Sequence, residues 1–325
     1  MRRIDCHTHL LGDHPAVAQM LDELNLEVVN ICVSRDTAGQ WRHQVGEYIR
    51  IAESYPGRYG WCTAFDMPTF DDAHYAGRVI EGLDRDFAAG AVACKVWKNI
   101  GMELKDSAGR FVMPDDPVFE PVFAHLARIG RPLVMHVAEP LACWQPLEPD
   151  NPHYGYYSRW PQWHMFGRPE YPGHADIIDA RDRLMERHPA LTVIGAHLAS
   201  LEYDVREIAR RMDRYPNFVV DTSARILDLS LQNRQTVRQF FIDYADRLLF
   251  GTDIVSRKSF AGMAEDERVQ AIAALRERYL AEQAFFETDR IVVIRGREVR
   301  GLDLPPAVAE KLFTTNSRRW IPGLP

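Results

Sequence analysis

The sequence lacks several features that mark whole classes of protein. It contains no apolar run near the ~20 residues of a membrane-spanning helix, and no basic tract that offers a surface to nucleic acid or anionic lipid. Its formal charge of −7 also argues against a nucleic-acid partner, which favours a basic face. We therefore expect a partner that is a small molecule, and neither nucleic acid nor a membrane.

Cysteine is scarce, and its pattern does not suit a disulfide framework. The number is odd, and most of the cysteines lie within apolar, strand-like runs. They are Cys6, Cys32, Cys62, Cys94 and Cys143. The opening Met1–Arg3 also leads directly into an apolar strand pattern, without a signal peptide. Buried, reduced thiols in a cytoplasmic protein fit both observations.

Short apolar runs alternate with longer amphipathic stretches along the whole chain. Such runs, rich in Val, Ile, Leu and Cys, are typical of parallel strands that are buried on both faces. Eight strands are predicted: Arg3–Leu10, Glu27–Val33, Tyr59–Phe65, Ala91–Trp97, Pro132–Ala138, Leu191–His197, Phe218–Ser223 and Leu248–Ile254.

An α/β chain of this kind forms either a closed barrel or an open doubly wound sheet. Three observations favour a closed (β/α)8 barrel of the TIM type. There are eight strands, and no Gly-rich phosphate turn follows the first. Polar residues also recur at the carboxyl ends of strands, where barrel enzymes place their chemistry. We expect residues 1–325 to form one such domain.

Two long segments depart from this regular alternation. Residues 139–173, after the fifth strand, are rich in aromatic residues and proline, which indicates a lid over a site or an arm that joins copies of the chain in a homo-oligomer. These two roles are compatible. Val255–Pro305, after the eighth strand, is an insertion with a charged helix, Glu265–Gln283, and a short hairpin near Ile291–Val299. No role is assigned to it.

The first strand ends in Asp5-Cys6-His7-Thr8-His9. Because side chains alternate along a strand, His7 and His9 share one face, while Cys6 and Thr8 point to the outer helices. In a barrel the shared face is the interior. Two imidazoles that converge there make half of a metal site.

Three further strand ends supply residues of the metal-ligand type: His136, His197 and Asp253. A lone buried histidine is more often a hydrogen-bonded core residue, and Asp253 after Gly-Thr is also a fitting helix cap. Four histidines and an aspartate at matching strand ends nevertheless favour a shared site, because cores rarely gather ionisable groups at one level.

This ordered set, His-x-His, His, His and Asp on strands one, five, six and eight, resembles the amidohydrolase superfamily and its "amidohydrolase 2" branch. The resemblance extends from Asp5–His9 to Leu312–Arg319. It implies that one divalent ion is bound by His7, His9, His136 and Asp253. In single-ion members the histidine at the position of His197 contacts substrate, and in two-ion members it binds the second metal. Imidazole and carboxylate ligands suit zinc, which we expect here, as well as manganese, iron or nickel.

The fourth strand places Lys95 and Trp97 on one face. If that face is inward, Lys95 is desolvated beside the metal site and its pKa falls. Two-ion members of the superfamily use a carboxylated lysine as a bridging metal ligand, and Lys95 is the candidate for that role. The alternatives are that Lys95 binds a substrate carboxylate or pairs with Glu139.

Three residues are candidates for substrate contacts. Arg225 follows the seventh strand and suits a bidentate clamp on a carboxylate or phosphate, although a surface arginine paired with a neighbour is an equal alternative. Glu139 lies just after His136 and either orients a ligand or contacts substrate. Trp97 shares the face of Lys95. The histidines in or beside the aromatic segment are interpreted as ordinary loop residues: His153, His164 and His174.

The resemblance implies a metal-dependent hydrolase that cleaves an amide, ester or lactone in a small molecule. Asp253 would act as the general base toward metal-activated water, and His197 would stabilise developing negative charge. A second hypothesis is a metal-dependent decarboxylase of an aromatic or unsaturated carboxylic acid, since the same branch contains such lyases. A third, less favoured because the full ligand set is present, is a non-catalytic barrel that acts through its aromatic segment.

Overall fold

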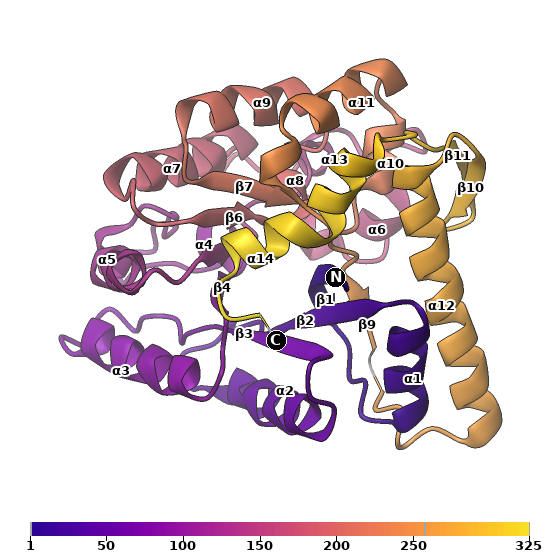
Figure 1. The fold of residues 1–325 in the computed structure, drawn as a ribbon. Helices are drawn as coiled ribbons and strands as arrows, with labels where there is room; N and C mark the ends of the chain where they lie inside the picture. Colours follow the sequence, from indigo (N-terminus) through magenta and orange to yellow (C-terminus); the bar gives the residue numbers. More distant parts are fainter. Residues whose placement is uncertain (1, 257, 325) are drawn as a thin grey trace.

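The computed structural model describes residues 2–256 and 258–324, and in them a nine-stranded parallel sheet forms the centre of the molecule (Figure 1). Around the sheet the strand order is β8-β7-β6-β5-β4-β3-β2-β1-β9, so strands that follow each other in the chain lie side by side. Their bounds are β1 Arg3–His9, β2 Leu26–Ile31, β3 Tyr59–Thr63, β4 Ala93–Val96, β5 Leu133–Met135, β6 Val193–Gly195, β7 Phe218–Asp221, β8 Leu248–Leu249 and β9 Ile254–Val255.

The sheet closes on itself through β8 and β9. These strands lie at opposite ends of the sheet order, yet only Phe250–Asp253 separate them in the chain. The backbone N–H of Cys6 in β1 also donates to the carbonyl oxygen of Phe250 at 2.9 Å, which joins the first strand to the eighth. The fold is therefore the predicted (β/α)8 barrel.

The prediction of one continuous eighth strand, Leu248–Ile254, is wrong. Thr252 leaves the ladder because its hydroxyl donates to the carboxylate of Asp5 at 2.6 Å. Asp253 then takes a left-handed backbone conformation, with a φ of 54°. The other strands are predicted at the right places, but most of them end earlier than predicted, since their carboxyl ends also turn sharply.

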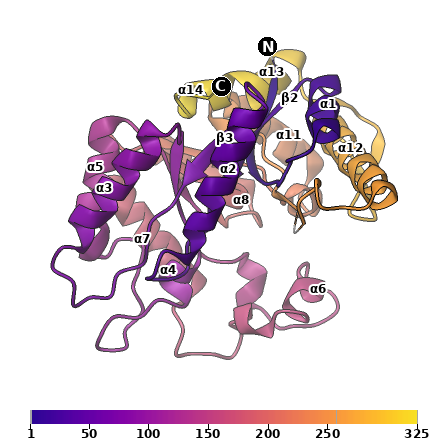
Figure 2. The ribbon, with the colours of Figure 1, turned by 90° about the horizontal axis from the view of Figure 1, so that it is seen from below.

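Helices cover the outside of the barrel (Figures 1 and 2). Helix α9, Val205–Arg214, shows why they form. Asp204 caps its first turn by accepting a backbone hydrogen bond, and Val205, Ile208 and Met212 are buried along one face. The other helices of the ring and of the C-terminus are α1 Pro15–Glu23, α2 His43–Ser54, α3 Tyr75–Ala88, α5 Glu120–Ile129, α7 His174–Arg187, α11 Arg234–Asp243, α13 Pro306–Glu310 and α14 Asn316–Trp320.

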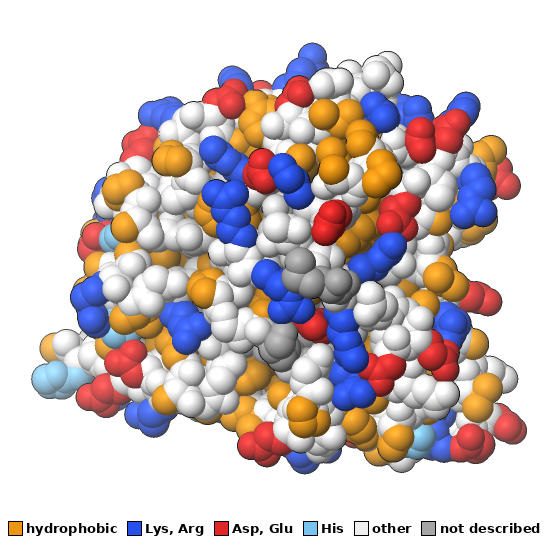
Figure 3. Space-filling model, in the orientation of Figure 1, with side chains coloured by type: hydrophobic (Ala, Val, Ile, Leu, Met, Phe, Trp, Pro, Cys, Tyr) orange, Lys and Arg blue, Asp and Glu red, His pale blue; other side chains and the backbone are white. Residues whose placement is uncertain are grey.

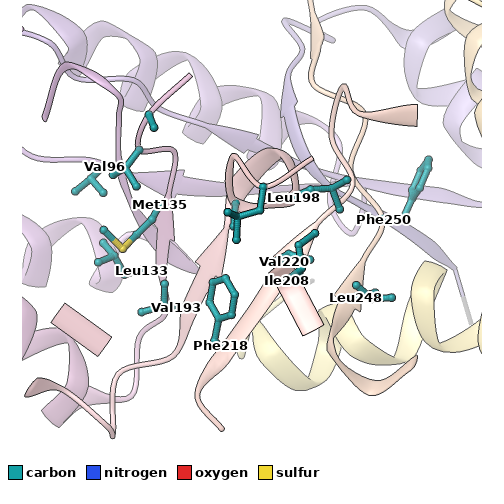
Figure 4. Packing of buried hydrophobic residues seen from close by; sticks show 14 of the residues in the cluster. Val96, Leu133, Met135, Val193, Leu198, Ile208, Phe218, Val220, Leu248 and Phe250 are labelled. Atoms are coloured by element: carbon teal, nitrogen blue, oxygen red, sulfur yellow. The ribbon is translucent and has the colours of Figure 1, made fainter. Parts of the chain in front are cut away.

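Apolar side chains form two layers, one on each side of the ring of strands. The outer layer packs strand residues against the helices; Figure 4 shows Val220 beside Ile208 of α9. The inner layer takes the alternate strand residues, such as Val219, and Ile321 just after α14 packs against it. Its strand members include Ile4, Cys6, Val29, Ile31, Cys62, Ala93, Val134, Ile194, Val219 and Leu249.

The segment of residues 139–173, called here the cover segment, is folded rather than irregular. It contains α6, Tyr154–Tyr157, and the single 3-10 turns Leu141–Trp144 and Pro161–Trp163. Short helices also follow β4, β6 and β7: α4 Asn99–Met102, α8 Ala196–Ala199 and α10 Ile226–Ser230. Figure 2 shows α4, α6 and α8 at the end of the barrel opposite to the two chain termini. That end is where the strands finish.

The insertion after the eighth strand contains both predicted elements. Helix α12, Glu265–Glu287, is about one turn longer than predicted, and the hairpin consists of β10 Ile291–Ile294 and β11 Arg297–Arg300. Among the residues described, no helix is both long enough and apolar enough to cross a bilayer. Figure 3 shows Lys and Arg intermixed with Asp and Glu on the face seen in Figure 1. All five cysteines are free and buried, as predicted.

Candidate metal centre

Strand β1 delivers His7 and His9 to the carboxyl end of the barrel. Its register against β2 shifts between Asp5 and Thr8, so that three steps along β1 match two along β2, as in a bulge. Cys6 belongs to the inner apolar layer together with Ile4, two residues earlier, so strand alternation still holds between them. The prediction that Cys6 points to the outer helices is therefore wrong.

Asp221, at the end of β7, fixes the His7 ring and was not singled out from the sequence. One of its oxygens lies 2.8 Å from Nδ1 of His7. The other accepts hydrogen bonds from the backbone N–H groups of His197 at 2.9 Å and Ser223 at 3.0 Å. Burial acts to raise the pKa of Asp221, but His7 outweighs it and lowers the pKa. Asp221 thus orients His7 so that its Nε2 is free to bind.

Asp253 is held in its left-handed conformation by neighbours on both sides. Its backbone N–H donates to the carbonyl oxygen of His7 at 2.8 Å. Arg278 of α12 donates to the preceding carbonyl, that of Thr252, at 2.6 Å. Such a backbone conformation costs of order 1–3 kcal/mol for a non-glycine residue, and it recurs at functional sites.

His7, His9 and Asp253 each offer a ligand atom, and these atoms all lie within 4.8 Å of one another. Nε2 of His9 is 3.5 Å from Oδ1 of Asp253, and the two side chains are 18% and 28% exposed. Burial acts to raise the pKa of Asp253, but the adjacent histidines outweigh it and lower the pKa to about 2. The side chain is therefore a carboxylate at neutral pH.

His136 follows β5, and its Nε2 atom is buried without a hydrogen-bond partner among the residues described. Buried polar atoms are nearly always bonded, so an orphaned one calls for an explanation. The ring of His136 lies 4.3 Å from that of His197 and packs edge-on against Trp97 at 6.4 Å, both measured between centroids. A metal ion would supply the missing partner.

His197 begins a left-handed turn, His197–Ser200, in which all four residues have φ between 56° and 59°. Helix α7 holds this turn: the fully buried Arg181 donates to the carbonyl oxygen of Ala199 at 2.7 Å, and Nε2 of His174 lies 2.8 Å from that of Ser200. A Cβ on Gly195 would lie 2.4 Å from that of Ala199, so this approach requires glycine. His174 is thus a structural residue.

The His197 ring is oriented by β7. Its Nδ1 lies 3.0 Å from the carbonyl oxygen of Ser223 and 2.9 Å from the hydroxyl of the same residue. The centroid of the ring is 4.7 Å from that of His7. With Nδ1 occupied, Nε2 is the nitrogen available to a metal or a substrate.

Lys95 lies inside the ring of strands, 2% exposed, with its Nζ 3.5 Å from Nε2 of His7. Burial lowers its pKa, as predicted. The alternative that Lys95 pairs with Glu139 is wrong: Glu139 forms an ion pair with Lys98, which also donates to the hydroxyl of Tyr156 at 3.2 Å. Carboxylation of Lys95 stays a prediction.

The donors gathered here fit a divalent metal ion. Burial lowers the pKa of His136 and His197 well below the usual value, and that of His9 to about 4. Their rings are therefore neutral, which metal coordination requires. These three neutral imidazoles, including the unpartnered Nε2 of His136, and the carboxylate of Asp253 form a donor set typical of zinc, iron, nickel or manganese sites.

A pocket of about 200 Å³ opens beside these donors. It is lined by Lys98, His136, Glu139, Pro140, His153, Tyr156, His197, Ala224, Arg225, Asp253 and Arg295. The structure thus brings Arg225 and Glu139 to the pocket, and the alternative of a surface arginine at position 225 is wrong, since Arg225 is 8% exposed. Trp97 is not among the described lining residues; it packs against His136 instead.

Four polar lining residues were missed from the sequence: Lys98, His153, Tyr156 and Arg295. His153 was interpreted as an ordinary loop histidine, yet its Nε2 lies 2.8 Å from a carboxylate oxygen of Asp228. His164, by contrast, contacts other residues of the cover segment: the carbonyl oxygen of Gln145 at 2.9 Å and the rings of Tyr157 and Phe166. The sequence did contain a signal for Lys98, because it follows the end of the fourth strand, where barrel enzymes place their site residues. The aromatic content of residues 139–173 indicated a lid or an arm, but not that His153 and Tyr156 would be the residues that reach the pocket. Nothing in the sequence indicated the position of Arg295.

Comparison with known proteins identifies the family and agrees with the fold. The amidohydrolase family model matches residues 4–322, which is nearly the whole chain. Among solved structures, 4-oxalomesaconate hydratase from Rhodopseudomonas palustris has a TM-score of 0.53 at 10% identity, with 99% of this chain and 96% of that chain covered. A Staphylococcus aureus protein assigned as an amidohydrolase has a TM-score of 0.53 at 12% identity, with 99% of each chain covered. None of the curated proteins matches. On the family match, the chain belongs to the amidohydrolase family, a family of enzymes.

Proposed function

We propose that the protein is a metal-dependent hydrolase that cleaves an amide, ester or lactone bond in a small molecule. The observation that carries the proposal is the convergence of His7, His9 and Asp253, whose ligand atoms lie within 4.8 Å of one another, beside the unpartnered Nε2 of His136. His7, His9, His136 and Asp253 would hold the ion, with His197 or Lys95 added if a second ion binds. When bound, a divalent ion polarises a substrate carbonyl and makes water acidic enough to react at neutral pH.

Asp253 is the residue suited to move the proton. It is a carboxylate at neutral pH, it lines the pocket, and it is partly exposed. As general base it takes a proton from the attacking water at a carboxylate oxygen and returns it to the leaving group. His197 lines the same pocket with a neutral ring whose Nδ1 faces the carbonyl oxygen of Ser223, so its Nε2 offers a lone pair to a metal or to a substrate hydrogen. Arg225, also in the lining, supplies the positive charge that stabilises a negative group of the substrate.

The cover segment is proposed to act as the lid of this pocket. Tyr156 and His153 contribute to the lining. Lys98 ties the segment to the end of β4 through Glu139, and its ammonium lies 3.9 Å from the ring centroid of Trp163. Exclusion of bulk water strengthens each electrostatic contact inside the pocket. An additional role in oligomer contacts stays a prediction.

The first test uses Asp253→Asn. Wild-type protein, loaded with zinc or manganese and analysed for metal content, is offered a panel of esters, lactones and amides. We expect hydrolysis of at least one class, and a loss of roughly 10²- to 10⁴-fold in kcat for Asp253→Asn. Asp266→Asn, an exposed carboxylate of α12, is the matched control and should leave kcat unchanged. Retained activity in Asp253→Asn would remove that residue from the mechanism.

A metal-dependent decarboxylase is the second candidate. Among the residues described, two candidate ligand groups share His7: one adds His9 and Asp253, the other His197 and Asp221. Asp221 is already bonded to the His7 ring and to the backbone N–H of His197, which favours the first group for a single ion and leaves His197 to contact substrate. The same metal-loaded protein is offered aromatic and unsaturated carboxylic acids while released carbon dioxide is measured. Carbon dioxide release without hydrolysis of any ester, lactone or amide would replace the first proposal with this one.

A further inference from the structure

The turn of the hairpin in the insertion contains an arginine, a residue type that a turn of this kind disfavours. Ile294 pairs with Arg297, so the turn consists of Arg295 and Gly296 alone. Both have positive φ, 51° and 79°, as in a type I′ turn. The first position of such a turn strongly favours Asn, Asp or Gly, because other side chains crowd the left-handed backbone. An arginine held there against its preference suggests a role for its side chain.

The hairpin is fixed in a position that brings this arginine to the metal site. Ile294, next to the turn, and Val299, further along the hairpin, are both buried, which anchors the hairpin. Strand β10 packs on α12 and β11 packs on α10, as Figure 1 shows. Because α10 begins directly after Arg225, the hairpin tip and Arg225 reach the same pocket, and both line it.

Arg225 is buried, yet its guanidinium is poorly satisfied. Its Nε has no hydrogen-bond partner among the residues described, and its Nη1 makes one long contact, 3.4 Å, with the carbonyl oxygen of Ala224. Three buried carboxylates act on its charge, but among the residues described none forms an ion pair with it: Asp228 contacts His153 at 2.8 Å, Glu139 pairs with Lys98, and Glu202 accepts from the backbone N–H of Leu141 at 3.0 Å. A buried guanidinium is expected to be paired, so a partner from outside the chain is called for.

We propose that Arg225 and Arg295 form a subsite for an anionic group of the substrate, a carboxylate or a phosphate. Guanidinium groups bind both through paired N–H donors, and two of them on one pocket wall repel each other until an anion lies between them. Arg225, on the barrel, fixes the position of the anion, while Arg295, on the insertion, selects for it. The inference rests on the proposed function only in placing the reacting bond beside Asp253.

The first experiment measures anion binding without turnover. The full chain, with and without added zinc, is titrated with benzoate and with inorganic phosphate by calorimetry. We expect Arg295→Asn to weaken binding by about tenfold or more, the loss of a charge-assisted hydrogen bond. Asn suits the first position of a type I′ turn, so the hairpin is retained. The anion that binds more tightly to the zinc-free protein identifies the group as carboxylate or phosphate.

Matched variants separate this subsite from general charge effects. Arg297→Gln removes an exposed arginine from the same hairpin, two residues from the tip, and should leave binding unchanged. Arg295→Lys should retain part of the affinity, and Arg225→Gln should lose at least as much as Arg295→Asn. Equal affinity in wild type and Arg295→Asn, or no binding of either anion at millimolar concentration, would overturn the proposal.

A kinetic experiment distinguishes an error in the proposed anion subsite from an error in the proposed function. Esters or lactones that carry a free carboxylate or a phosphate are compared with their neutral methyl esters. For the charged substrates we expect Arg295→Asn to raise KM about tenfold with little change in kcat. For the neutral substrates we expect the same variant to change neither KM nor kcat. Hydrolysis that ignores substrate charge overturns the subsite alone. Anion binding that depends on Arg295 without hydrolysis of any substrate overturns the proposed function alone.

Discussion

The two ends of the barrel are built on different principles. At the amino end, near both chain termini in Figure 2, Ile321 after α14 packs on the inner apolar layer that begins with Ile4. At the carboxyl end, four strands are followed by non-glycine residues in left-handed conformations. These are Ala138, His197–Ser200, Ala224 and Asp253. Barrel enzymes use the first end for stability and the second for chemistry.

The difference shows where this chain tolerates strain. Each left-handed residue costs roughly 1–2 kcal/mol, and such residues rarely occur as a run of four. The turn His197–Ser200 persists because Arg181 and His174 bond its carbonyl groups, and because the hydroxyl of Ser200 donates to the carbonyl of Val137 at 2.8 Å. The amino end needs only apolar volume, whereas the carboxyl end needs particular atoms at particular positions.

The largest expected loss of stability tests the amino end. Ile4 is fully buried in the inner layer. Ile4→Ala should lower the free energy of unfolding by about 2–5 kcal/mol, because it removes buried methyl groups and leaves a cavity. Chemical denaturation measures this change, and metal content measures the site. Ile4→Val, the smaller truncation, should cost about 0.5–1.5 kcal/mol. Metal binding that falls in proportion to stability would contradict the separation of the two ends.

A smaller effect on stability, with a larger effect on the site, is expected at the carboxyl end. Arg181→Met leaves the carbonyl oxygen of Ala199 without its buried donor, which costs about 1–3 kcal/mol. Because that turn places His197, the ligand available to a second ion, affinity for that second zinc ion should fall about 10- to 100-fold, as for other losses of a ligand's support. Competition with a chelating dye measures this affinity.

The matched control for Arg181→Met is Arg183→Met on the same helix. Arg183 is exposed and pairs with Asp115 at 2.7 Å, away from the turn. Its loss should change neither stability nor zinc affinity appreciably. Equal zinc affinity in wild type and Arg181→Met would show that the turn does not depend on this arginine.

Two features were predicted from the sequence for the same reason: the apolar strands that build the amino end of the barrel, and the presence of ligand-type residues at its carboxyl end. Apolar runs at regular spacing specify strands, and ligand-type residues after strands specify a site. Runs such as Val193–Gly195 were located correctly, and His7, His9, His136, His197 and Asp253 do gather at one level of the barrel. The positions of the strands and of the ligand-type residues both follow from the hydrophobic periodicity of the sequence.

Periodicity does not carry the local exceptions. Three such exceptions depend on tertiary contacts: the bulge in β1 between Asp5 and Thr8, the break of the eighth strand at Asp253, and the pairing of Glu139 with Lys98 rather than Lys95. Arg295 lies far from the other pocket residues in the sequence, and only the folded insertion brings it there. Strand alternation fails where the backbone is strained, which in this molecule is beside the metal ligands.

The smallest effect compares one buried glutamate at each end. Burial raises the pKa of both, but Glu27 at the amino end is paired with Arg318, whereas Oε2 of Glu202, near the pocket, has no hydrogen-bond partner among the residues described. A carboxyl whose pKa is raised by folding stabilises the protein most below its ordinary value of 4.5, and this contribution is lost as pH rises through the raised pKa.

The variant Glu202→Gln cannot ionise at this position, so it does not lose stability in this way. The difference in unfolding free energy between Glu202→Gln and wild type should therefore increase, in favour of the variant, between pH 4 and pH 7. Denaturation series across this range measure the difference, and Glu148→Gln, an exposed carboxyl of the cover segment, should show none. A Glu202→Gln variant that parallels wild type at every pH would mean that Glu202 is solvated, and that polar groups beside the pocket are no more strained than those at the amino end.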